Sequence, residues 1–528
     1  MGSKKLQVWL PIIFSLVLIV GMILGYQIRG DIKSDSFFNL SNSSSLQEVL
    51  HLIQDKYVDA LPQDSINEVT ITDLLSHLDP HSIYIPASDF REVNDELMGN
   101  FQGIGVEFQL FNDTVNIIRV LKNGPSEKAG LQIGDKIITA NDTVQLAGKK
   151  LNAENIRKQL RGAAGTSVKI TIVRDNIKKD VTIERGSIPV SSIDAAYIIA
   201  PKTGYLRINK FAERTYEEFM QSMEMLQKQG MQKLVLDLRG NGGGLLNEAV
   251  AIADEFLDGD KLIVYTQGNK SARVDYRCKK DGIFEKGKLI VLVDETSASA
   301  SEVLTGALQD WDRATIIGRR TFGKGLVQQQ FQLSDGSALR LTVARYYTPL
   351  GRSIQKPYNK GKEKYEEELL NRFHDGEVIK GDTAKPIGKS FKTASGHIVY
   401  GGGGITPDIF IPFDTSKNSM PIINLFYKNT LNNFVYQFYI QNKQEFKNVN
   451  SVKTIDSLLN KNENNWQLLQ KFAAKDSIIL SNISLKEKEE VIERMKAIMA
   501  RQILGPEGYF ETLNYYDKAI QKSIELMK

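Results

Sequence analysis

Apolar and polar residues follow different spacings in successive parts of the chain. Residues 46–57 place an apolar side chain at every third or fourth position, and residues 71–78 continue this pattern, which is typical of helices. We therefore predict an N-terminal helical domain at 46–100. From residue 101 the pattern changes to short alternating runs separated by glycine turns, which predicts a β-rich domain at 101–186.

Continuous apolar runs mark the next part of the chain, residues 187–412. The run at 234–238 predicts a buried strand, a helix follows at 246–257, and a second apolar strand is expected at 289–293. This order of strand, helix and strand is typical of a βαβ core. The tail, residues 413–528, is helical in pattern and rich in Asn, Gln, Lys and Glu, so we expect its charged side chains to lie on solvated helix faces.

Residues 8–26 are almost entirely apolar, and as a helix they nearly span the hydrocarbon core of a bilayer, at about 1.5 Å per residue. We predict an uncleaved transmembrane anchor at 1–30 and a tether at 31–45. A cleaved signal peptide is the alternative, although no Ala-x-Ala site follows the run. Lys4 and Lys5 precede the run and favour a cytoplasmic N-terminus, so the body would lie on the exported side, periplasmic or extracytoplasmic.

The composition excludes several classes of protein. The 528 residues are 41% hydrophobic and 25% charged, which is typical of a globular chain with several domains and not of a disordered one. The 67 Lys and Arg against 63 Asp and Glu leave a net charge of +4, too small for the basic face that nucleic-acid binding requires. Cys278 is the only cysteine and no Cys/His cluster has zinc-ligand spacing, so we expect neither a disulfide nor a metal site.

A glycine-rich loop at 240–244 lies between the predicted strand and helix. Its spacing matches neither the dinucleotide-binding GxGxxG pattern nor the phosphate-binding GxxxxGK[ST] pattern. Residues without side chains let a substrate carbonyl approach, so the loop could instead supply N–H donors to a transient oxyanion. A plain strand-to-helix turn is the alternative for the same residues.

The serine-rich run at 296–302 lies where a strand ends and a helix begins. A serine there can cap the helix, or it can act as a nucleophile beside N–H groups that hold an oxyanion. A serine hydroxyl is a weak nucleophile without a base, and Lys324, between two glycines, is the lysine best placed against the sheet. The histidines all lie outside the α/β stretch, at His51, His77, His81, His374 and His397.

Together these motifs resemble the carboxy-terminal processing peptidases, exported serine proteases with a Ser/Lys dyad and a PDZ domain. The resemblance covers about residues 45–412 and leaves out the tail. Its motifs are Leu78-Asp79-Pro80-His81-Ser82, Gly103-Ile104-Gly105-Val106, Gly124-Pro125 through Gly134-Asp135, Leu236-Asp237-Leu238-Arg239, Ser297-Ala298-Ser299-Ala300-Ser301-Glu302, Thr321-Phe322-Gly323-Lys324-Gly325 and Gly404-Ile405-Thr406-Pro407-Asp408.

The resemblance implies an α/β catalytic core, crotonase-like and built on βαβ units, with an inserted PDZ domain and no cofactor. It also assigns catalytic roles residue by residue. These are Ser299 as nucleophile, Lys324 as general base, Gln328 as the residue that orients the lysine, and the N–H groups of Ala300 and Gly244 as the oxyanion hole, with Gly243 the near alternative.

The PDZ motif also has a physical basis of its own. Gly103, Ile104, Gly105 and Val106 can present N–H groups to a terminal carboxylate, while the adjacent strand edge accepts the peptide. The expected partners are therefore protein or peptide substrates recognised by their C-terminus, besides the membrane. A helical tail could also mediate homo-oligomerisation.

The function implied by the resemblance is that of a membrane-anchored serine endopeptidase that cleaves near unstructured C-termini of exported proteins through an acyl-enzyme. The alternatives are a non-hydrolytic ligand-binding protein on the same fold and a PDZ scaffold that localises partners. Neither alternative needs a serine and a lysine, so the presence of both Ser299 and Lys324 favours the peptidase.

Overall fold

The structure is a computed structural model that describes residues 15, 17, 19–21, 45–59, 63–111, 113–148, 152–381, 388–414, 419–461 and 464–528. The chain divides into two units, Met1–Ile71 and Thr72–Lys528. The first unit contains helix α2 (Ser45–Lys56) and the beginning of α3 (Gln63–Ser76). Most of the predicted anchor and tether lies outside the described residues, and no helix among those described is long and apolar enough to cross a bilayer.

The α/β region is built around a six-stranded sheet in the order β10-β11-β12-β15-β16-β21. Its strands are β10 (Ile193–Ala200), β11 (Thr203–Ile208), β12 (Lys233–Asp237), β15 (Lys288–Val293), β16 (Thr315–Gly318) and β21 (Ile409–Phe410). Strands β10 and β11 are antiparallel, and the remaining neighbours are parallel. Parallel neighbours need crossover connections, and helices supply several of them here, as the order of apolar runs predicts.

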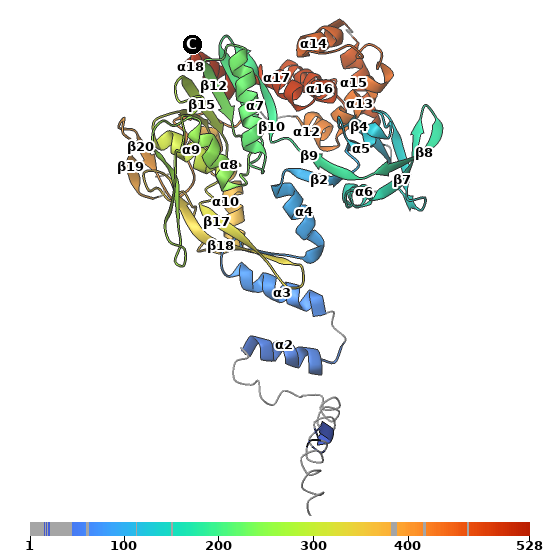
Figure 1. The fold of residues 1–528 in the computed structure, drawn as a ribbon. Coiled ribbons are helices and arrows are strands. Elements are labelled where there is room, and N and C mark those ends of the chain that lie inside the picture. The colour runs from blue at the N-terminus through green and yellow to red at the C-terminus, as the bar shows by residue number, and fades with distance from the viewer. Residues whose placement is uncertain are drawn as a thin grey trace, which may run out of the picture. The chain divides into compact units, whose positions relative to one another are not determined.

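Helices cover one face of this sheet (Figure 1). They are α7 (Thr215–Lys228), α8 (Leu246–Asp254) and α9 (Ala300–Asp310). Successive residues of a strand point to opposite faces, and Leu234 and Leu236 of β12 pack on this side with Phe219, Ile252 and Leu304 of the three helices. All five side chains are fully buried, so this layer is a continuous hydrophobic core.

The C-terminal end of the chain covers the opposite face. Val235, Ile290 and Leu292 pack there with Ile520 of α18 (Lys518–Met527). The C-terminus accordingly lies beside β12 and β15 in Figure 1. The helical pattern of the tail predicts the helix, but this apolar contact makes part of the tail a layer of the α/β region.

The rest of the tail has a hydrophobic core of its own, which includes Leu425, Val435 and Leu469. Its helices are α12 (Met420–Tyr427), α13 (Thr430–Gln441), α14 (Val452–Lys461), α15 (Asn465–Lys475), α16 (Leu485–Leu504) and α17 (Pro506–Asn514). Ser484 and Glu487 form a capping box at the start of α16. The helical pattern of residues 422–528 thus corresponds to real helices.

A second sheet, in the order β1-β18-β13-β14 with β17 paired to β18, lies in the same unit. Its strands are β1 (Ile83–Ile85), β13 (Leu262–Gln267), β14 (Val274–Arg277), β17 (Leu326–Gln332) and β18 (Ala338–Tyr347), followed by α10 (Lys362–His374), α11 (Glu377–Lys380) and the short pair β19 (Ser390–Lys392) and β20 (Ile398–Tyr400). Strand β1 comes from the region predicted to be helical, just before α4 (Ala87–Leu97). It connects that region to the β17–β18 hairpin.

The predicted β-rich domain forms an antiparallel sheet in the order β3-β4-β5-β7-β8. Its elements are β3 (Val106–Phe111), β4 (Thr114–Val120), α5 (Pro125–Lys128), β5 (Lys136–Ala140), β6 (Val144–Gln145), α6 (Ala153–Leu160), β7 (Ser167–Arg174) and β8 (Ile177–Glu184), and the pair β2 (Asn100–Gly103) and β9 (Gly186–Pro189) joins it to the α/β region. Strand β3 lies at the sheet edge, with α6 over the core formed by Ile117, Ile137 and Ile156.

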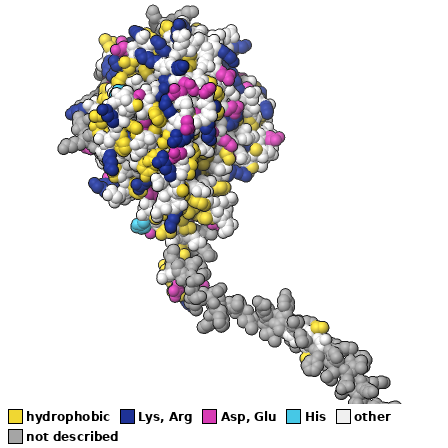
Figure 2. Space-filling view, turned by 60° about the vertical axis from the view of Figure 1, so that its left-hand side comes forward, with side chains coloured by type: hydrophobic (Ala, Val, Ile, Leu, Met, Phe, Trp, Pro, Cys, Tyr) yellow, Lys and Arg dark blue, Asp and Glu magenta, His cyan; other side chains and the backbone are white. Residues whose placement is uncertain are grey.

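Charged side chains of both signs are mixed on the surface that Figure 2 shows. This mixing agrees with the formal net charge of +4 over 528 residues. The face shown therefore has no extended basic patch of the kind that attracts a nucleic-acid backbone.

Candidate active site

Ser299 lies directly before helix α9, in the loop that follows strand β15. Its backbone has φ 54° and ψ −113°, a region that residues other than glycine rarely occupy. The Glu302 carboxylate accepts the Ser299 N–H at 2.8 Å and so helps to hold this conformation. Such backbone strain is typical of residues at functional sites.

The two neighbouring serines are bound differently. Ser297 is fully buried and its hydroxyl donates to the Leu238 carbonyl at 2.8 Å, and the buried Ser301 hydroxyl donates to the Asn241 carbonyl at 2.9 Å. Both bonds tie the serine loop to the end of β12 and the glycine loop. Ser299 is the only half-exposed serine of the three, so it alone can reach a substrate.

The glycine loop lies against Ser299. A Cβ on Gly243 would come within 2.8 Å of the Ser299 Cβ and 3.0 Å of the Ala300 nitrogen, so only glycine fits there. The Gly243 N–H donates to the Asn241 side chain at 2.9 Å. Within the described part of the chain, the N–H groups of Gly244 and Ala300 have no acceptor, which leaves both available to a bound molecule.

Lys324 lies in the loop before β17, half-buried, and its Nζ donates to the Gln328 Oε1 at 3.1 Å. The Gln328 amide in turn donates to the His81 carbonyl. Burial lowers the pKa of Lys324, and the positive charge of Arg340 lowers it further, whereas Glu302 and Asp79 act in the opposite direction. The lysine is therefore easier to deprotonate than an exposed one.

Glu302 joins the serine and lysine loops. One carboxylate oxygen accepts the Thr321 hydroxyl at 2.5 Å and the Gly323 N–H at 2.7 Å, and the other accepts the N–H groups of Lys324 at 2.9 Å and Ser299 at 2.8 Å. The side chain is fully buried, and burial raises the pKa of Glu302 to about 7. A single carboxylate thus fixes the backbone of both candidate catalytic residues.

Tyr346 of β18 contacts the same two residues from another side. Its hydroxyl lies 2.5 Å from the Lys324 carbonyl oxygen and 3.1 Å from the Ser299 carbonyl oxygen. The Tyr346 ring is buried. The structure therefore holds the backbones of Ser299 and Lys324 against the same tyrosine hydroxyl and the same carboxylate, although the two residues are 25 positions apart in the sequence.

His81 is the histidine that reaches this site, and reasoning from the sequence missed it. Burial, and then the charge of Lys324, lowers the pKa of His81 to about 4, and its Nε2 lies 2.9 Å from the Tyr365 hydroxyl. The Asp79 carboxylate accepts the His81 N–H and the Thr342 hydroxyl of β18, which fixes the turn. The Asp79-Pro80-His81 motif was the available signal, but nothing in it indicates the distant contact.

Two of the other histidines have different surroundings. His397 pairs with Asp312 at 3.0 Å and its side chain is 72% exposed, while His374 ends helix α10. Among the described residues no cluster of His, Cys, Asp and Glu could hold a metal ion. Cys278 is buried, and burial raises the pKa of its thiol to about 12, so it is a poor nucleophile.

The Gly103–Val106 loop opens onto a cavity of about 550 Å³. All four residues of the loop line this cavity, together with strand β3 and helix α6. Gly105 has φ 78°, and the carbonyls of Ile104 and Gly105 accept N–H groups of Ser126 and Leu121. The loop is thus held open at the start of an edge strand, where an extended peptide could pair.

Comparison with known proteins shows which families the chain resembles. Residues 202–361 match peptidase family S41, residues 102–184 match the PDZ domain, and residues 422–505 match a family of unknown function. A carboxy-terminal-processing protease of Bartonella bacilliformis is 37% identical over 315 residues, 58% of this chain and 71% of that protein. A probable CtpA-like serine protease of Staphylococcus aureus is 35% identical over 334 residues, 63% of this chain and 65% of that protein. The solved structure of a photosystem II D1 C-terminal processing protease matches with 27% identity and a TM-score of 0.37, over 70% of this chain and 86% of that one.

Proposed function

The chain belongs to the carboxy-terminal-processing serine peptidases of family S41, and we propose that it is a membrane-anchored endopeptidase that cleaves exported proteins near their unstructured C-termini. The observation that carries this proposal is the coupling of Ser299 to Lys324 through Glu302 and Tyr346. Among the described residues, the N–H groups of Ala300, which follows the serine, and of Gly244, in the glycine loop, have no acceptor.

The proposed reaction begins when the Ser299 Oγ attacks the substrate carbonyl and its proton passes to neutral Lys324 Nζ. The N–H groups of Gly244 and Ala300 donate to the oxyanion. As the C–N bond breaks, the Lys324 ammonium returns the proton to the leaving amine, and an ester on Ser299 remains. Water then attacks the ester, Lys324 takes the water proton and passes it to Ser299, and the acid product leaves.

The lowered pKa of Lys324 supports its role as the base. At the reference pKa of about 10.4, less than about 0.1% of a lysine is neutral at pH 7. Burial disfavours the ammonium, and Gln328 orients the amine through its Oε1. The occupied N–H of Gly243 favours Gly244 as the oxyanion glycine.

Recognition of the substrate is assigned to the PDZ domain. The Gly103–Val106 loop would hold the terminal carboxylate, and the free edge of β3 would pair with the preceding residues. The apolar run at 8–26 supports anchoring, with the body on the exported side. A crotonase-like classification of the core belongs to the same proposal, supported by the parallel strands β11, β12, β15 and β16.

The experiment is hydrolysis of an unstructured, internally quenched peptide with a free C-terminus. Ser299→Ala should reduce kcat/KM by at least about 10³-fold, and Lys324→Arg should be as inactive as Lys324→Ala because a guanidinium stays charged. Ser301→Ala should lose far less, and amidation of the peptide should slow cleavage. Substantial turnover by Lys324→Arg would mean that another group is the base, and equal rates for acid and amide would exclude terminal recognition.

A further inference from the structure

The tail contacts the PDZ domain on the outer face of its edge strand. Glu107 and Gln109 of β3 point to this face, whereas Val106 and Phe108 pack against the domain core on the α6 side. Glu107 pairs with Arg501 of α16 at 3.5 Å. Gln109 donates to Asn433 of α13, and Phe111 stacks on Phe472 of α15 with ring centroids 6.2 Å apart.

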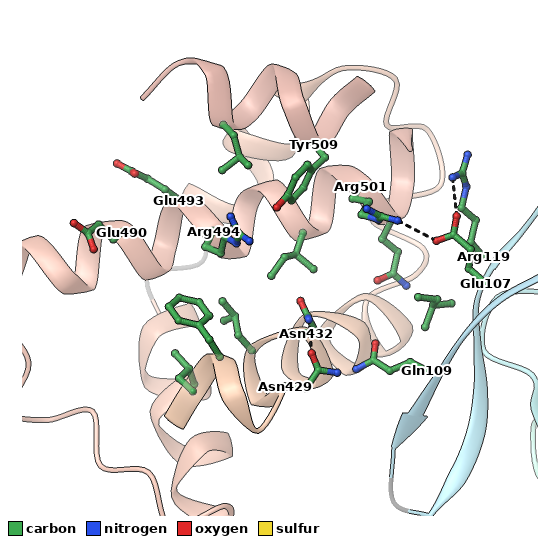
Figure 3. A pocket seen from close by; sticks show the side chains of 17 residues that line it. Glu107, Gln109, Arg119, Asn429, Asn432, Glu490, Glu493, Arg494, Arg501 and Tyr509 are labelled. Atoms are coloured by element: carbon green, nitrogen blue, oxygen red, sulfur yellow. Dashed lines mark hydrogen bonds and ion pairs between the residues drawn. The ribbon is translucent and has the colours of Figure 1, made fainter. Parts of the chain in front are cut away.

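A cavity of about 710 Å³ lies between the tail and this face of the strand (Figure 3). Helices α12, α13, α16 and α17 form one wall, and β3 and β4 form the other. It meets the PDZ cavity around the edge of β3, since Glu107, Gln109, Asn429 and Arg501 line both. A peptide at this edge would therefore have one cavity on each side.

Alternation of side chains then divides the peptide between the two cavities. A strand paired with β3 directs successive side chains to opposite faces of the sheet. One set would enter the PDZ cavity beside α6, and the other set would point to the tail. Side chains of the same set are about 7 Å apart, so a cavity of about 710 Å³ has room for two of them.

The lining of the tail cavity indicates which side chains it accepts. Leu425, Leu431, Ile498 and Leu513 contribute apolar surface, and Phe426, which also lines the cavity, is 40% exposed. The charges at one end satisfy each other, because Glu107 pairs with both Arg119 and Arg501. Arg494 stacks over Tyr509 at 5.6 Å, which Figure 3 shows in the middle of the cavity.

We propose that the tail is the second wall of the substrate groove and selects large apolar or aromatic side chains at alternate positions of the substrate's C-terminal segment. This inference rests on the proposed function, since it takes the PDZ domain to hold the substrate's C-terminus. It assigns a role to residues 422–505, whose matching family has no known function.

The test measures binding of labelled peptides to the full chain carrying Ser299→Ala, by fluorescence anisotropy. One tryptophan is moved through the last six positions of a polar, free-acid peptide. Phe426→Ala should weaken binding about fivefold when tryptophan occupies every second position of one set, either the odd or the even positions. Ala153→Trp, at the first residue of α6 in the lining of the PDZ cavity, should weaken binding at the other set of positions. Tyr427→Ala is the matched control, because Tyr427 is the next residue of α12, 88% exposed, and does not line the cavity.

Further arms keep the two proposals separate. An amidated peptide that binds as well as the free acid would exclude carboxylate capture and with it the PDZ part of the proposed function. The tail would be excluded as a wall of the groove if the free acid bound better than the amide but Phe426→Ala weakened binding equally at every tryptophan position, or at none. Should Phe426→Ala be unstable, Ile498→Trp, which fills the same cavity, must weaken binding at the same set of positions. Hydrolysis of the peptide by the Ser299→Ala chain would contradict the assignment of Ser299 as nucleophile, and it would not bear on the role of the tail.

Discussion

Glu302→Gln should lower the activity of the enzyme about 10- to 100-fold and should remove a loss of stability that the wild type shows as pH rises. In the folded protein the carboxylate accepts four hydrogen bonds, two at each oxygen, from groups around Ser299 and Lys324. An amide has one acceptor oxygen, and its NH₂ group would face at least one N–H that needs an acceptor. The variant therefore tests whether an ionised carboxylate, rather than its shape, organises the site.

The effect on stability follows from the pKa of Glu302. Its rise from 4.5 to about 7, caused by burial, means that the folded state binds the proton more tightly than the unfolded state. The free energy of unfolding therefore falls as pH rises from about 4.5 to 7, by about 3 kcal/mol at about 1.4 kcal/mol per pKa unit. Glutamine carries no titratable proton, so the variant should lack this fall, and its stability relative to the wild type should rise by up to about 3 kcal/mol between pH 5 and pH 8.

The effect on activity has the opposite sign. Hydrogen bonds to an ionised acceptor are about twice as strong as neutral ones, and the weaker amide must hold Ser299 at its strained φ of 54°. A loss of about 1.4 to 2.8 kcal/mol in the transition state corresponds to about 10- to 100-fold in kcat. Below pH 7 the wild type should lose activity in the same way, because protonation of Glu302 removes the same acceptor.

Calorimetric unfolding at pH 5 and pH 8, with peptide hydrolysis at pH 8, measures both effects. Glu248→Gln is a matched control, since Glu248 is a half-buried carboxylate of α8 that accepts the Tyr216 N–H, away from the serine loop. It should retain activity. A Glu302→Gln enzyme with more than half of the wild-type kcat/KM, or one whose stability relative to the wild type does not rise between pH 5 and pH 8, would refute this role for the carboxylate.

Two further predictions concern the base and the fold. Arg340 lowers the pKa of Lys324, so Arg340→Gln should raise that pKa and move the acid limb of the pH–rate profile to higher pH without changing the alkaline plateau. Arg345→Gln on the same strand is the control. An acid limb that does not move in Arg340→Gln would exclude the charge effect. Ile520→Ala should lower the free energy of unfolding by about 2 to 5 kcal/mol, because Ile520 is fully buried against the sheet. Lys522→Ala should change it little, because Lys522 is half-buried and its ammonium pairs with Glu525 of the same helix. Equal effects of the two substitutions would contradict the packing of α18.

Local patterns predicted the elements better than the contacts between them. The runs at 234–238 and 289–293 became β12 and β15, because a strand covered on both faces is apolar at successive positions. That pattern requires a second covering layer but does not identify it. The layer is α18, more than 220 residues after β15, and no local signal connects the two.

The candidate site shows the same limit. Ser299 and Lys324 could be chosen from their small neighbours, which leave room for a substrate or for tight packing. The partners that position them are separated from them in sequence: Tyr346 follows on β18, and His81 precedes Lys324 by 243 positions. Glu302 lies in the serine motif itself, but its sequence position suggests only a helix cap, not an acceptor for the lysine loop.

The charges around Lys324 explain why this site needs a carboxylate of unusual pKa. A base must be neutral, and Glu302 opposes this by favouring the ammonium form of Lys324, whereas burial and Arg340 favour the amine. His81, with a pKa of about 4, is uncharged near neutral pH and does not disturb this balance. Glu302 itself titrates at about pH 7, so its charge and the protonation of Lys324 are coupled, and the acid limb of the rate profile belongs to the pair. Removing the negative charge of Glu302 should therefore favour the neutral amine of Lys324, but it should also weaken the hydrogen bonds that hold the backbone of Lys324 and Ser299. The activity of the Glu302→Gln enzyme is then limited by the geometry of the site and not by the proton affinity of Lys324.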